Sequence, residues 1–425
     1  MEIVENCQSK IKKNYSKLLP WFICFVASLF FFYEFIQGNM FASIADNIMR
    51  DFQIKADKMT YLSSIYYLSN VVFLFFAGIA LDRFSAKKTV ILAMFFCVIS
   101  TFILAHTHSF AVALGCRFVT GIGSAFCFLG PIRITSRWFA PKKMAMVTGV
   151  IVTIAMTGGM LAQYPLTKLV LLIGWRNSLI YIGWIGLFIL FIMATVLQDA
   201  PYKNSQSTKT KIKIFETLKS TYFNPQTIRA AAYGSLMNMS IAVFGAVMGS
   251  LYLVQRLGID KEAASMINSM LFLGTILGGP FMGWISDRIG LRIAPMKAGV
   301  IASMLCILGI LYGDLSFSGM AILFFMLGFF TSSQVISYAL VAESSSSAIT
   351  ATAVSIVSIL TQSGYIIYQN IFSILLIKHG GMQIFNNTPT YSLADFQFAT
   401  NLLPIGLILA AISLIGLKET FCHRI

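Results

Sequence analysis

Two stretches of this sequence share one form, Gly78-Ile-Ala-Leu-Asp82-Arg83 and Gly283-Trp-Ile-Ser-Asp287-Arg288. Each ends a long apolar run, and the two aspartates are 205 residues apart. The same offset relates two further pairs of glycines, Gly123 with Gly328 and Gly159 with Gly364. Three sites that share one offset indicate that the chain consists of two related halves.

The composition excludes an ordinary soluble protein. The chain has 425 residues, of which 57% are hydrophobic and 11% are charged, and its mean hydropathy is +0.79. Soluble domains carry roughly 25% charged residues, so we expect a lipid bilayer to cover much of the surface. The formal net charge of +15 does not indicate nucleic acid, because the basic residues lie in short loops between apolar runs.

The apolar runs predict an all-α membrane protein. A helix needs about 20 apolar residues to cross a bilayer, and the runs lack the alternating pattern of a membrane β-barrel. Twelve transmembrane helices are expected, in two pseudo-symmetric six-helix bundles of residues 1–197 and 227–425, joined by a polar linker over 198–226. The predicted spans are 18–45, 59–80, 88–106, 109–136, 143–171, 175–197, 227–256, 263–285, 293–313, 317–342, 347–377 and 395–416.

The distribution of Lys and Arg predicts the orientation. With the N-terminus inside, 22 basic residues fall on the inner side and 8 on the outer side. Cytoplasmic loops are the ones enriched in Lys and Arg. We therefore expect both termini and the linker to be cytoplasmic, and we expect a multi-pass protein of the plasma membrane, specifically a bacterial inner membrane.

The loop motifs resemble those of a known family. The stretch from Gly78 to Lys88 and its twin from Gly283 to Arg292 are similar to the G-x-x-x-D-R-x-G-R-K signature of the major facilitator superfamily. Arg117-Phe-Val-Thr-Gly121-Ile-Gly123 is similar to that family's R-x-x-x-G-x-G pattern. One departure is Ser85, where the family usually has glycine. The resemblance implies a secondary transporter with the fold of that family.

The resemblance also implies a gating latch. Asp82 is expected near the start of the eleventh span and Asp287 near the start of the fifth, with Arg83 and Arg288 as basic partners. Such contacts would tie the halves together on the cytoplasmic side in the outward-open state. The alternative is that these residues only solubilise the loops and direct the topology.

Two charged residues fall inside predicted spans, Glu34 in the first and Arg117 in the fourth. At 1.5 Å per residue, Glu34 lies ~24 Å and Arg117 ~20 Å from the inner side of a ~30 Å hydrocarbon core. An acid near this arginine resembles the proton-coupled organic-anion branch of the family. Our hypothesis is that Glu34 is the proton-coupling carboxylate and Arg117 its partner or a ligand for substrate charge. The alternatives are a purely structural pair or an arginine bound to backbone carbonyls.

Polar side chains within the spans predict a substrate cavity between the halves. Each of them could instead make an ordinary hydrogen bond between helices. The candidates are Tyr33, Gln37, Gln163, Asn238, Gln334 and Tyr338, within a wider set that includes Tyr66 and Asn70. The stretch from Tyr67 to Arg83 also resembles the lysosomal dipeptide-transporter branch, although Ser124 stands where that branch often has an acid.

Taken together, these features predict a secondary active transporter for a small polar solute, such as an amino acid, a peptide or an organic acid. Proton-coupled symport is expected, and a proton-driven efflux antiporter or a uniporter are the alternatives. No nucleotide-binding loop is present, and His106 and His108 have no acidic neighbour in sequence, so neither an ATP-driven pump nor an enzyme is indicated. We expect no catalytic residue, no metal, no cofactor and a monomer.

Overall fold

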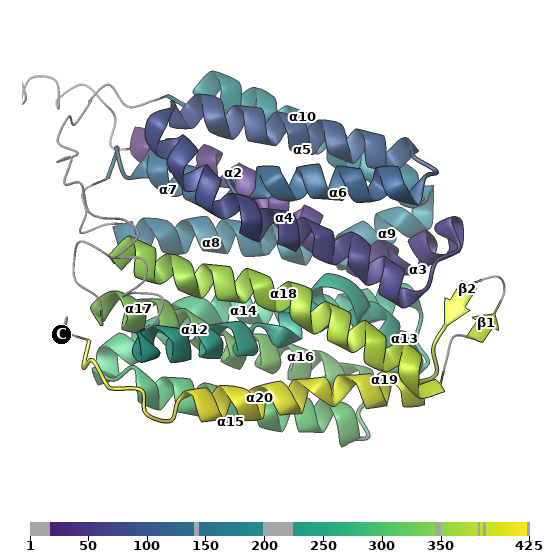
Figure 1. The fold of residues 1–425 in the computed structure, drawn as a ribbon. Helices are drawn as coiled ribbons and strands as arrows, with labels where there is room; N and C mark the ends of the chain where they lie inside the picture. Colours follow the sequence, from purple (N-terminus) through teal and green to yellow (C-terminus); the bar gives the residue numbers. More distant parts are fainter. Residues whose placement is uncertain are drawn as a thin grey trace, which may run out of the picture.

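The computed structural model describes residues 18–139, 144–198, 224–344, 350–380, 383–385 and 388–422. Within these parts, ten helical stretches are long and apolar enough to cross a membrane. Two more long helices, α4 and α18, run alongside them (Figure 1) and complete the twelve expected crossings. The protein is therefore a multi-pass, all-helical membrane protein, as the sequence predicts.

The first half occupies the upper part of Figure 1. Its helices are α2 (Leu19–Asn39), α3 (Phe41–Phe52), α4 (Ala56–Arg83), α5 (Ala86–His106), α6 (Phe110–Ser124), α7 (Leu129–Thr135), α8 (Met144–Leu161), α9 (Tyr164–Ile173) and α10 (Trp175–Val196).

The second half lies below it in the same view. Its elements are α12 (Pro225–Met237), the π-helix η2 (Ile241–Met248), α13 (Gly249–Leu257), α14 (Lys261–Ile289), α15 (Ile293–Tyr312), α16 (Phe317–Thr331), the 3-10 turn η3 (Ser332–Gln334), α17 (Val335–Glu343), α18 (Thr350–Gly380), α19 (Leu393–Thr400) and α20 (Leu402–Ser413). Most of the predicted linker lies outside the described residues.

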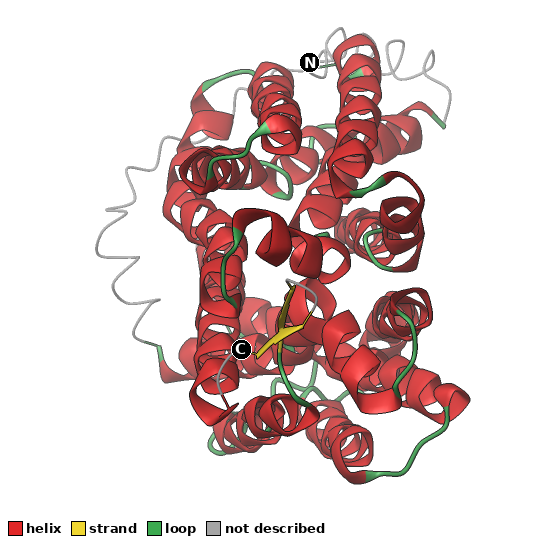
Figure 2. Cartoon of the chain, turned by 90° about the vertical axis from the view of Figure 1, so that its right-hand side faces the viewer, coloured by secondary structure: helices red, strands yellow, loops and turns green. Residues whose placement is uncertain are grey.

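The molecule has two ends, which we name by what they carry. The linker face, on the left of Figure 1, holds the turns near residues 84–85 and 290–292 and the C-terminal segment. The hairpin face, on the right, holds a two-stranded hairpin of β1 (Gln383–Phe385) and β2 (Thr388–Thr390). Figure 2 looks onto this face, and β2 contacts α3 of the other half. The hairpin was not predicted from the sequence.

Local sequence explains where several helices begin. Ser85 is the N-cap of α5, and its hydroxyl accepts the backbone N–H of Lys88 at 3.2 Å. Asp260 caps α14 in the same way through the backbone N–H of Ala263, at 2.7 Å. Such caps satisfy backbone donors that have no partner inside the helix. The departure from the family pattern at Ser85 therefore supplies a helix cap.

Two glycines place helix crossings in direct backbone contact. A β-carbon on Gly121 of α6 would collide with the carbonyl oxygen of Tyr66 on α4, and one on Gly328 of α16 would collide with that of Leu271 on α14. Tyr66 and Leu271 are 205 residues apart. In the structure, Gly121 and Gly328 therefore occupy equivalent positions in the two halves. The sequence offset of 205 residues pairs Gly328 with Gly123 instead, two residues further along α6.

The outer surfaces of both halves are apolar. Large exposed hydrophobic side chains cover α5 and α10 in the first half and α15 and α20 in the second. Examples are Phe96, Phe188, Phe191, Leu305 and Ile408. Contiguous apolar surface of this kind is stable only against lipid.

Candidate functional site

Glu34 lies near the end of α2 and is fully enclosed, with a relative exposure of 1%. The hydroxyl of Tyr66 on α4 donates to its Oε2 at 3.0 Å and also lies 3.3 Å from its backbone carbonyl oxygen. The other carboxylate oxygen, Oε1, has no hydrogen-bond partner among the described residues. A buried carboxylate with an oxygen that lacks a hydrogen-bond partner is costly, so Glu34 remains a candidate functional residue.

Arg117 lies on α6 and is completely buried. Its Nε donates to the carbonyl oxygen of Leu62 at 3.3 Å. Its guanidinium carbon lies 4.5 Å from the ring centroid of Tyr66 and 4.8 Å from that of Phe41. Both terminal nitrogens have no hydrogen-bond partner among the described residues. The arginine is thus held by two aromatic faces, with two donor groups unused.

Tyr66 therefore joins the two charged residues, which make no direct hydrogen bond to each other. Its hydroxyl contacts Glu34 and its ring contacts Arg117. We call these three residues the charge cluster. The sequence predicts a similar depth for Glu34 and Arg117, and their contact with one side chain agrees with it. Arg117 also binds a backbone carbonyl, so the alternative of an arginine bound to carbonyls describes part of its geometry.

Tyr33 and Gln37 lie on α2 but point into the first half. The Tyr33 hydroxyl is 3.0 Å and the Gln37 Nε2 is 2.9 Å from the hydroxyl of Thr101 on α5. Both residues are buried. In this structure they connect α2 to α5, and they do not reach the second half.

Gln163, between α8 and α9, connects the two halves. Its Nε2 donates to the carbonyl oxygen of Gly245 in η2 at 2.8 Å, and its Oε1 accepts from Asn268 of α14 at 2.6 Å. Both ends of the buried amide are thus satisfied by the other half. The geometry assigns Gln163 to the contact between the halves, where the sequence suggests a cavity residue.

Asn238 and Gln334 lie together in the second half. The Gln334 Nε2 donates to Oδ1 of Asn238 at 3.0 Å, which links η3 to the end of α12. Tyr338 follows on α17 and is half-buried. Gln334 Oε1 has no hydrogen-bond partner among the described residues. This amide pair remains the clearest polar candidate in the second half.

The hairpin face is closed by contacts between the halves. Lys261 of α14 pairs with Asp46 of α3 and lies 3.3 Å from Asn47, and Glu262 accepts from the Tyr164 hydroxyl at 3.0 Å. Further contacts join α4 to the second half. They are Thr60 to Ser373 at 2.9 Å, the backbone N–H of Ala56 to the Tyr391 hydroxyl at 3.0 Å, and the rings of Tyr67 and Tyr365, with centroids 4.6 Å apart.

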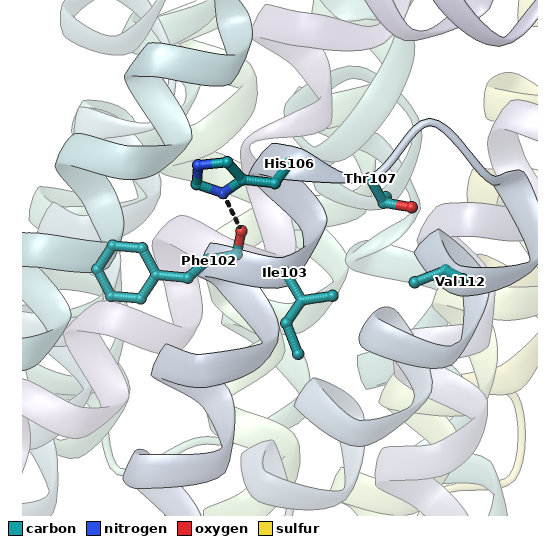
Figure 3. Close-up of a pocket in the computed structure, with 5 residues that line it drawn as sticks. All are labelled: Phe102, Ile103, His106, Thr107 and Val112. Atoms are coloured by element: carbon teal, nitrogen blue, oxygen red, sulfur yellow. Dashed lines mark hydrogen bonds between the residues drawn. The ribbon is translucent and has the colours of Figure 1, made fainter.

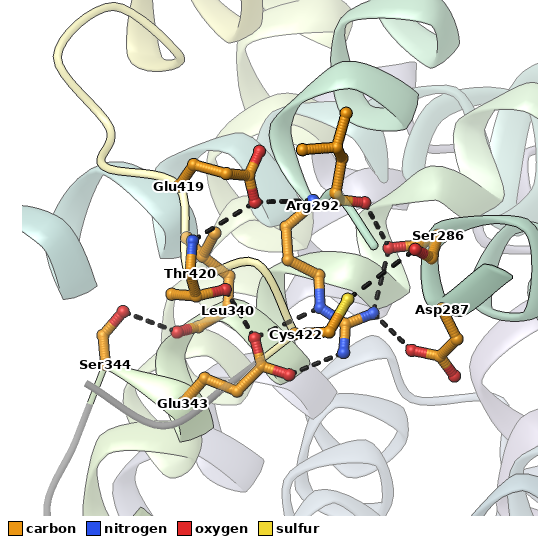
Figure 4. A network of polar contacts seen from close by, with 10 residues as sticks. Ser286, Asp287, Arg292, Leu340, Glu343, Ser344, Glu419, Thr420 and Cys422 are labelled. Atoms are coloured by element: carbon orange, nitrogen blue, oxygen red, sulfur yellow. Dashed lines mark hydrogen bonds and ion pairs between the residues drawn. The ribbon is translucent and has the colours of Figure 1, made fainter. Parts of the chain in front are cut away.

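The second copy of the loop motif forms an ionic network at the linker face (Figure 4). Arg292 binds Asp287 through Nη1 at 2.6 Å and holds Glu343 through Nη2 at 2.6 Å and Nε at 3.2 Å. Burial disfavours its charge, but Glu343 and Asp287 outweigh burial and raise the pKa of Arg292. Glu419 accepts the backbone N–H groups of Arg292 and Ile293 at 2.7 and 2.9 Å, which caps α15.

This network shows the partners that residues of the predicted latch have within the second half. The partner of Asp287 is Arg292, whereas Arg288 lies over the ring of Trp284 at 5.2 Å. The side chains of Asp82 and Arg83 and the first residues of the fifth and eleventh spans lie outside the described residues, so the predicted contact across the halves stays a prediction. Sequence reasoning missed Glu343 and Glu419, because they are far from the motif along the chain.

A shallow pocket at the corner of α5 and α6 lies apart from the charge cluster (Figure 3). It is lined by Phe102, Ile103, His106, Thr107 and Val112. The His106 ring nitrogen Nδ1 lies 2.8 Å from the backbone oxygen of Phe102 in the preceding turn. His106 is therefore committed to its own helix, and this pocket holds no group of the predicted site.

Comparison with known families decides the identity of the fold. The sequence model described as Major Facilitator Superfamily matches residues 23–244 and again residues 230–417. The chain belongs to the major facilitator superfamily. Members of this superfamily are transporters, not enzymes.

Several curated transporters are similar to this chain. The hexuronate transporter of Bacillus subtilis is 23% identical over 274 residues, covering 64% of either chain. The human lysosomal dipeptide transporter MFSD1 is 24% identical over 279 residues, covering 62% of this chain and 60% of its own. The sialic acid transporter NanX of Escherichia coli is 22% identical over 319 residues, covering 70% and 76%. The chain thus spans less than two thirds of the length of the first two of these relatives.

A solved structure supports the superfamily fold over nearly the whole chain. A bacterial homolog of the human lysosomal transporter Spinster, in an inward-facing and unoccupied conformation, superposes with a TM-score of 0.74 at 16% identity. The superposition covers 94% of this chain and 97% of that one.

Proposed function

We propose that this superfamily member is a proton-coupled symporter for a small polar solute that carries a carboxylate. The observation that carries the proposal is the charge cluster. It holds a buried acid and a buried arginine on one tyrosine, with one carboxylate oxygen and two guanidinium nitrogens unused. Charged groups inside a membrane protein are costly when some of their polar atoms lack hydrogen-bond partners. A bound proton or anionic ligand would supply those partners.

Arg117 is the proposed ligand for the substrate carboxylate. A guanidinium presents two parallel N–H donors that match the two oxygens of a carboxylate, and both terminal nitrogens lack a hydrogen-bond partner among the described residues. Amino acids, peptides and organic acids all carry such a group. The names of the hexuronate and sialic acid transporters among the relatives agree with an anionic solute.

Glu34 is the proposed proton carrier. A proton would bind the free Oε1, while Oε2 keeps its contact with Tyr66. Loading the site with both a proton and an anion keeps the buried region close to neutral, which lowers the cost of closing it from water. Alternating access would then require the contacts of the hairpin face to break and those of the linker face to form.

We further propose the setting in which this occurs. The excess of basic residues at the linker face favours a cytoplasmic linker and cytoplasmic termini in a bacterial inner membrane. The apolar outer surfaces of both halves fit a monomer surrounded by lipid.

The test is uptake into proteoliposomes of amino acids, dipeptides and sugar acids, with and without an inward proton gradient. Wild-type protein should accumulate one of these solutes only with the gradient, and Glu34→Gln should equilibrate the solute without accumulating it. Asp314→Asn is the matched control, because it replaces an exposed acid on the hairpin face.

Two other outcomes would replace the proposal. Flux that ignores the gradient in wild type and variant alike would indicate a uniporter, with Glu34 and Arg117 as a structural pair. Gradient-driven extrusion of the solute, with its direction opposite to proton entry, would indicate an efflux antiporter.

A further inference from the structure

We infer that Tyr66 is a positioning residue that links the charge on Glu34 to the placement of Arg117. This inference rests on the proposed function, because it assigns the residue through which the proton site acts on the anion site. No hydrogen bond or ion pair joins Glu34 to Arg117 in the described parts of the chain, and Tyr66 contacts both residues.

The hydroxyl of Tyr66 senses the carboxylate. It donates to Oε2 of Glu34 at 3.0 Å, and a hydrogen bond to a charged acceptor is roughly twice as strong as a neutral one. When Glu34 takes up a proton on Oε1, the negative charge that attracts the hydroxyl disappears. The hydroxyl is then held by a weaker bond, so the tyrosine ring becomes freer to move.

The ring of Tyr66 holds the arginine. Among the described residues, Arg117 makes one hydrogen bond, from Nε to the carbonyl oxygen of Leu62, and its guanidinium lies over the rings of Tyr66 and Phe41. A cation over an aromatic face is attracted by the ring, most strongly in a desolvated site. A shift of the Tyr66 ring therefore changes the position of the two free N–H groups that would meet the substrate.

The surroundings of Glu34 leave Tyr66 as the connecting side chain in the described parts. The titratable or charged groups that face Glu34 are Tyr66 on α4, Cys97 on α5, Arg117 on α6, Tyr33 on its own helix and Cys127 beyond α6. Tyr33 is bonded to Thr101. The Cys97 thiol lies beside the Glu34 carboxylate and donates to the backbone oxygen of Thr120 at 3.7 Å. Of these groups, Tyr66 is the one that combines a hydrogen bond to the Glu34 carboxylate with a ring against the Arg117 guanidinium.

Tyr66 is also one residue from the contact between the halves. The ring of Tyr67 meets the ring of Tyr365 on α18, and the rings of Tyr66 and Tyr67 are 5.0 Å apart in an edge-to-face arrangement. A change at the charge cluster is therefore adjacent to a contact that must break when the hairpin face opens.

Two substitutions separate the two roles of the cluster. Tyr66→Phe keeps the ring over Arg117 and removes the hydroxyl from Glu34. Phe41→Leu removes the other ring over Arg117 and leaves the Tyr66 hydroxyl in place. Tyr252→Phe is the matched control, because it removes a buried hydroxyl on α13 of the second half that donates to the backbone oxygen of Ile310 at 3.1 Å.

The readouts are the KM for the solute and the stimulation of uptake by an inward proton gradient. We expect Tyr66→Phe to reduce gradient stimulation about tenfold, the effect of losing a hydrogen bond to a charged group, with KM within about twofold of wild type. We expect Phe41→Leu to raise KM about threefold to tenfold through the lost ring contact, with gradient stimulation kept. Tyr252→Phe should match wild type in both.

The outcomes divide as follows. If Glu34→Gln abolishes gradient stimulation while Tyr66→Phe keeps it, the inference about Tyr66 is wrong and the proposed function stands. If Glu34→Gln keeps gradient stimulation, the proposed function and this inference both fall. If Tyr66→Phe does not yield folded protein, Phe41→Leu still decides the matter, because loss of gradient stimulation in that variant contradicts the separation of roles.

Discussion

At the scale of single residues, the function proposed here depends on three side chains that share one buried volume. Intramembrane position alone identifies Glu34 and Arg117 in the sequence, since a charge in an apolar run is rare. Tyr66 carries no such signal, because the chain has 16 tyrosines and many lie in spans. Its role depends on packing between α2, α4 and α6, which the sequence does not specify residue by residue.

Replacement of Arg117 by lysine tests the proposed anion site. Lysine keeps a positive charge but has neither the flat face that contacts Tyr66 and Phe41 nor two parallel donors. We expect the apparent affinity for a carboxylate solute to fall about tenfold or more, in line with a lost charged hydrogen bond. Uptake kinetics measure this, with Arg256→Lys on α13 as the control. An unchanged KM would contradict the assignment of Arg117.

At the scale of helices, the sequence predicts the crossings well and their interruptions poorly. The predicted first span, 18–45, is broken at Met40, where α2 gives way to α3. The π-helix η2 was not predicted either, and it offers the carbonyls of Ala242 and Gly245 to Gln369 and Gln163. Such breaks are stabilised by partners distant in sequence, so local apolar periodicity does not reveal them.

Helix spacing around the charge cluster depends on Gly121. A methyl group there would collide with the backbone of Tyr66 on α4, whereas a β-carbon on Gly115 of the same helix meets nothing within 4 Å. We expect Gly121→Ala to destabilise the protein by about 1–3 kcal/mol through overpacking. Gly115→Ala should leave stability equal or slightly raised, because alanine favours a helix over glycine. Thermal unfolding in detergent compares them, and equal melting temperatures would contradict this packing.

At the scale of the whole molecule, the structure has its halves joined at the hairpin face. The repeated loop motifs in the sequence indicate the duplication and the superfamily, and the apolar runs indicate the twelve crossings. The closed hairpin face is not evident from the sequence. Asp46 pairs with Lys261 and Gln163 with Asn268, and these partners are identified only when the two halves are placed together. For Gln163, the sequence shows a polar residue inside a span but does not show that its partners are Gly245 and Asn268 of the other half.

The ion pair between Lys261 and Asp46 should favour closure of this face. The pair is partly exposed, with side-chain exposures of 14% and 28%, and such pairs contribute about 1 kcal/mol or less. Lys261→Met should therefore shift the conformational equilibrium toward an open hairpin face by up to about fivefold. Distances between spin labels at His108 and Asp314 would report the shift, with Lys378→Met as control. An unaltered distance distribution would exclude a gating role for the pair.

The central claim is that Glu34 carries the proton that moves with the solute. The most direct measurement is proton entry into proteoliposomes, followed by an internal pH dye when solute is added outside without any imposed gradient. The account predicts that solute addition acidifies the interior of wild-type vesicles, and that Glu34→Gln vesicles take up solute with no acidification. Equal acidification by wild type and Glu34→Gln would contradict it.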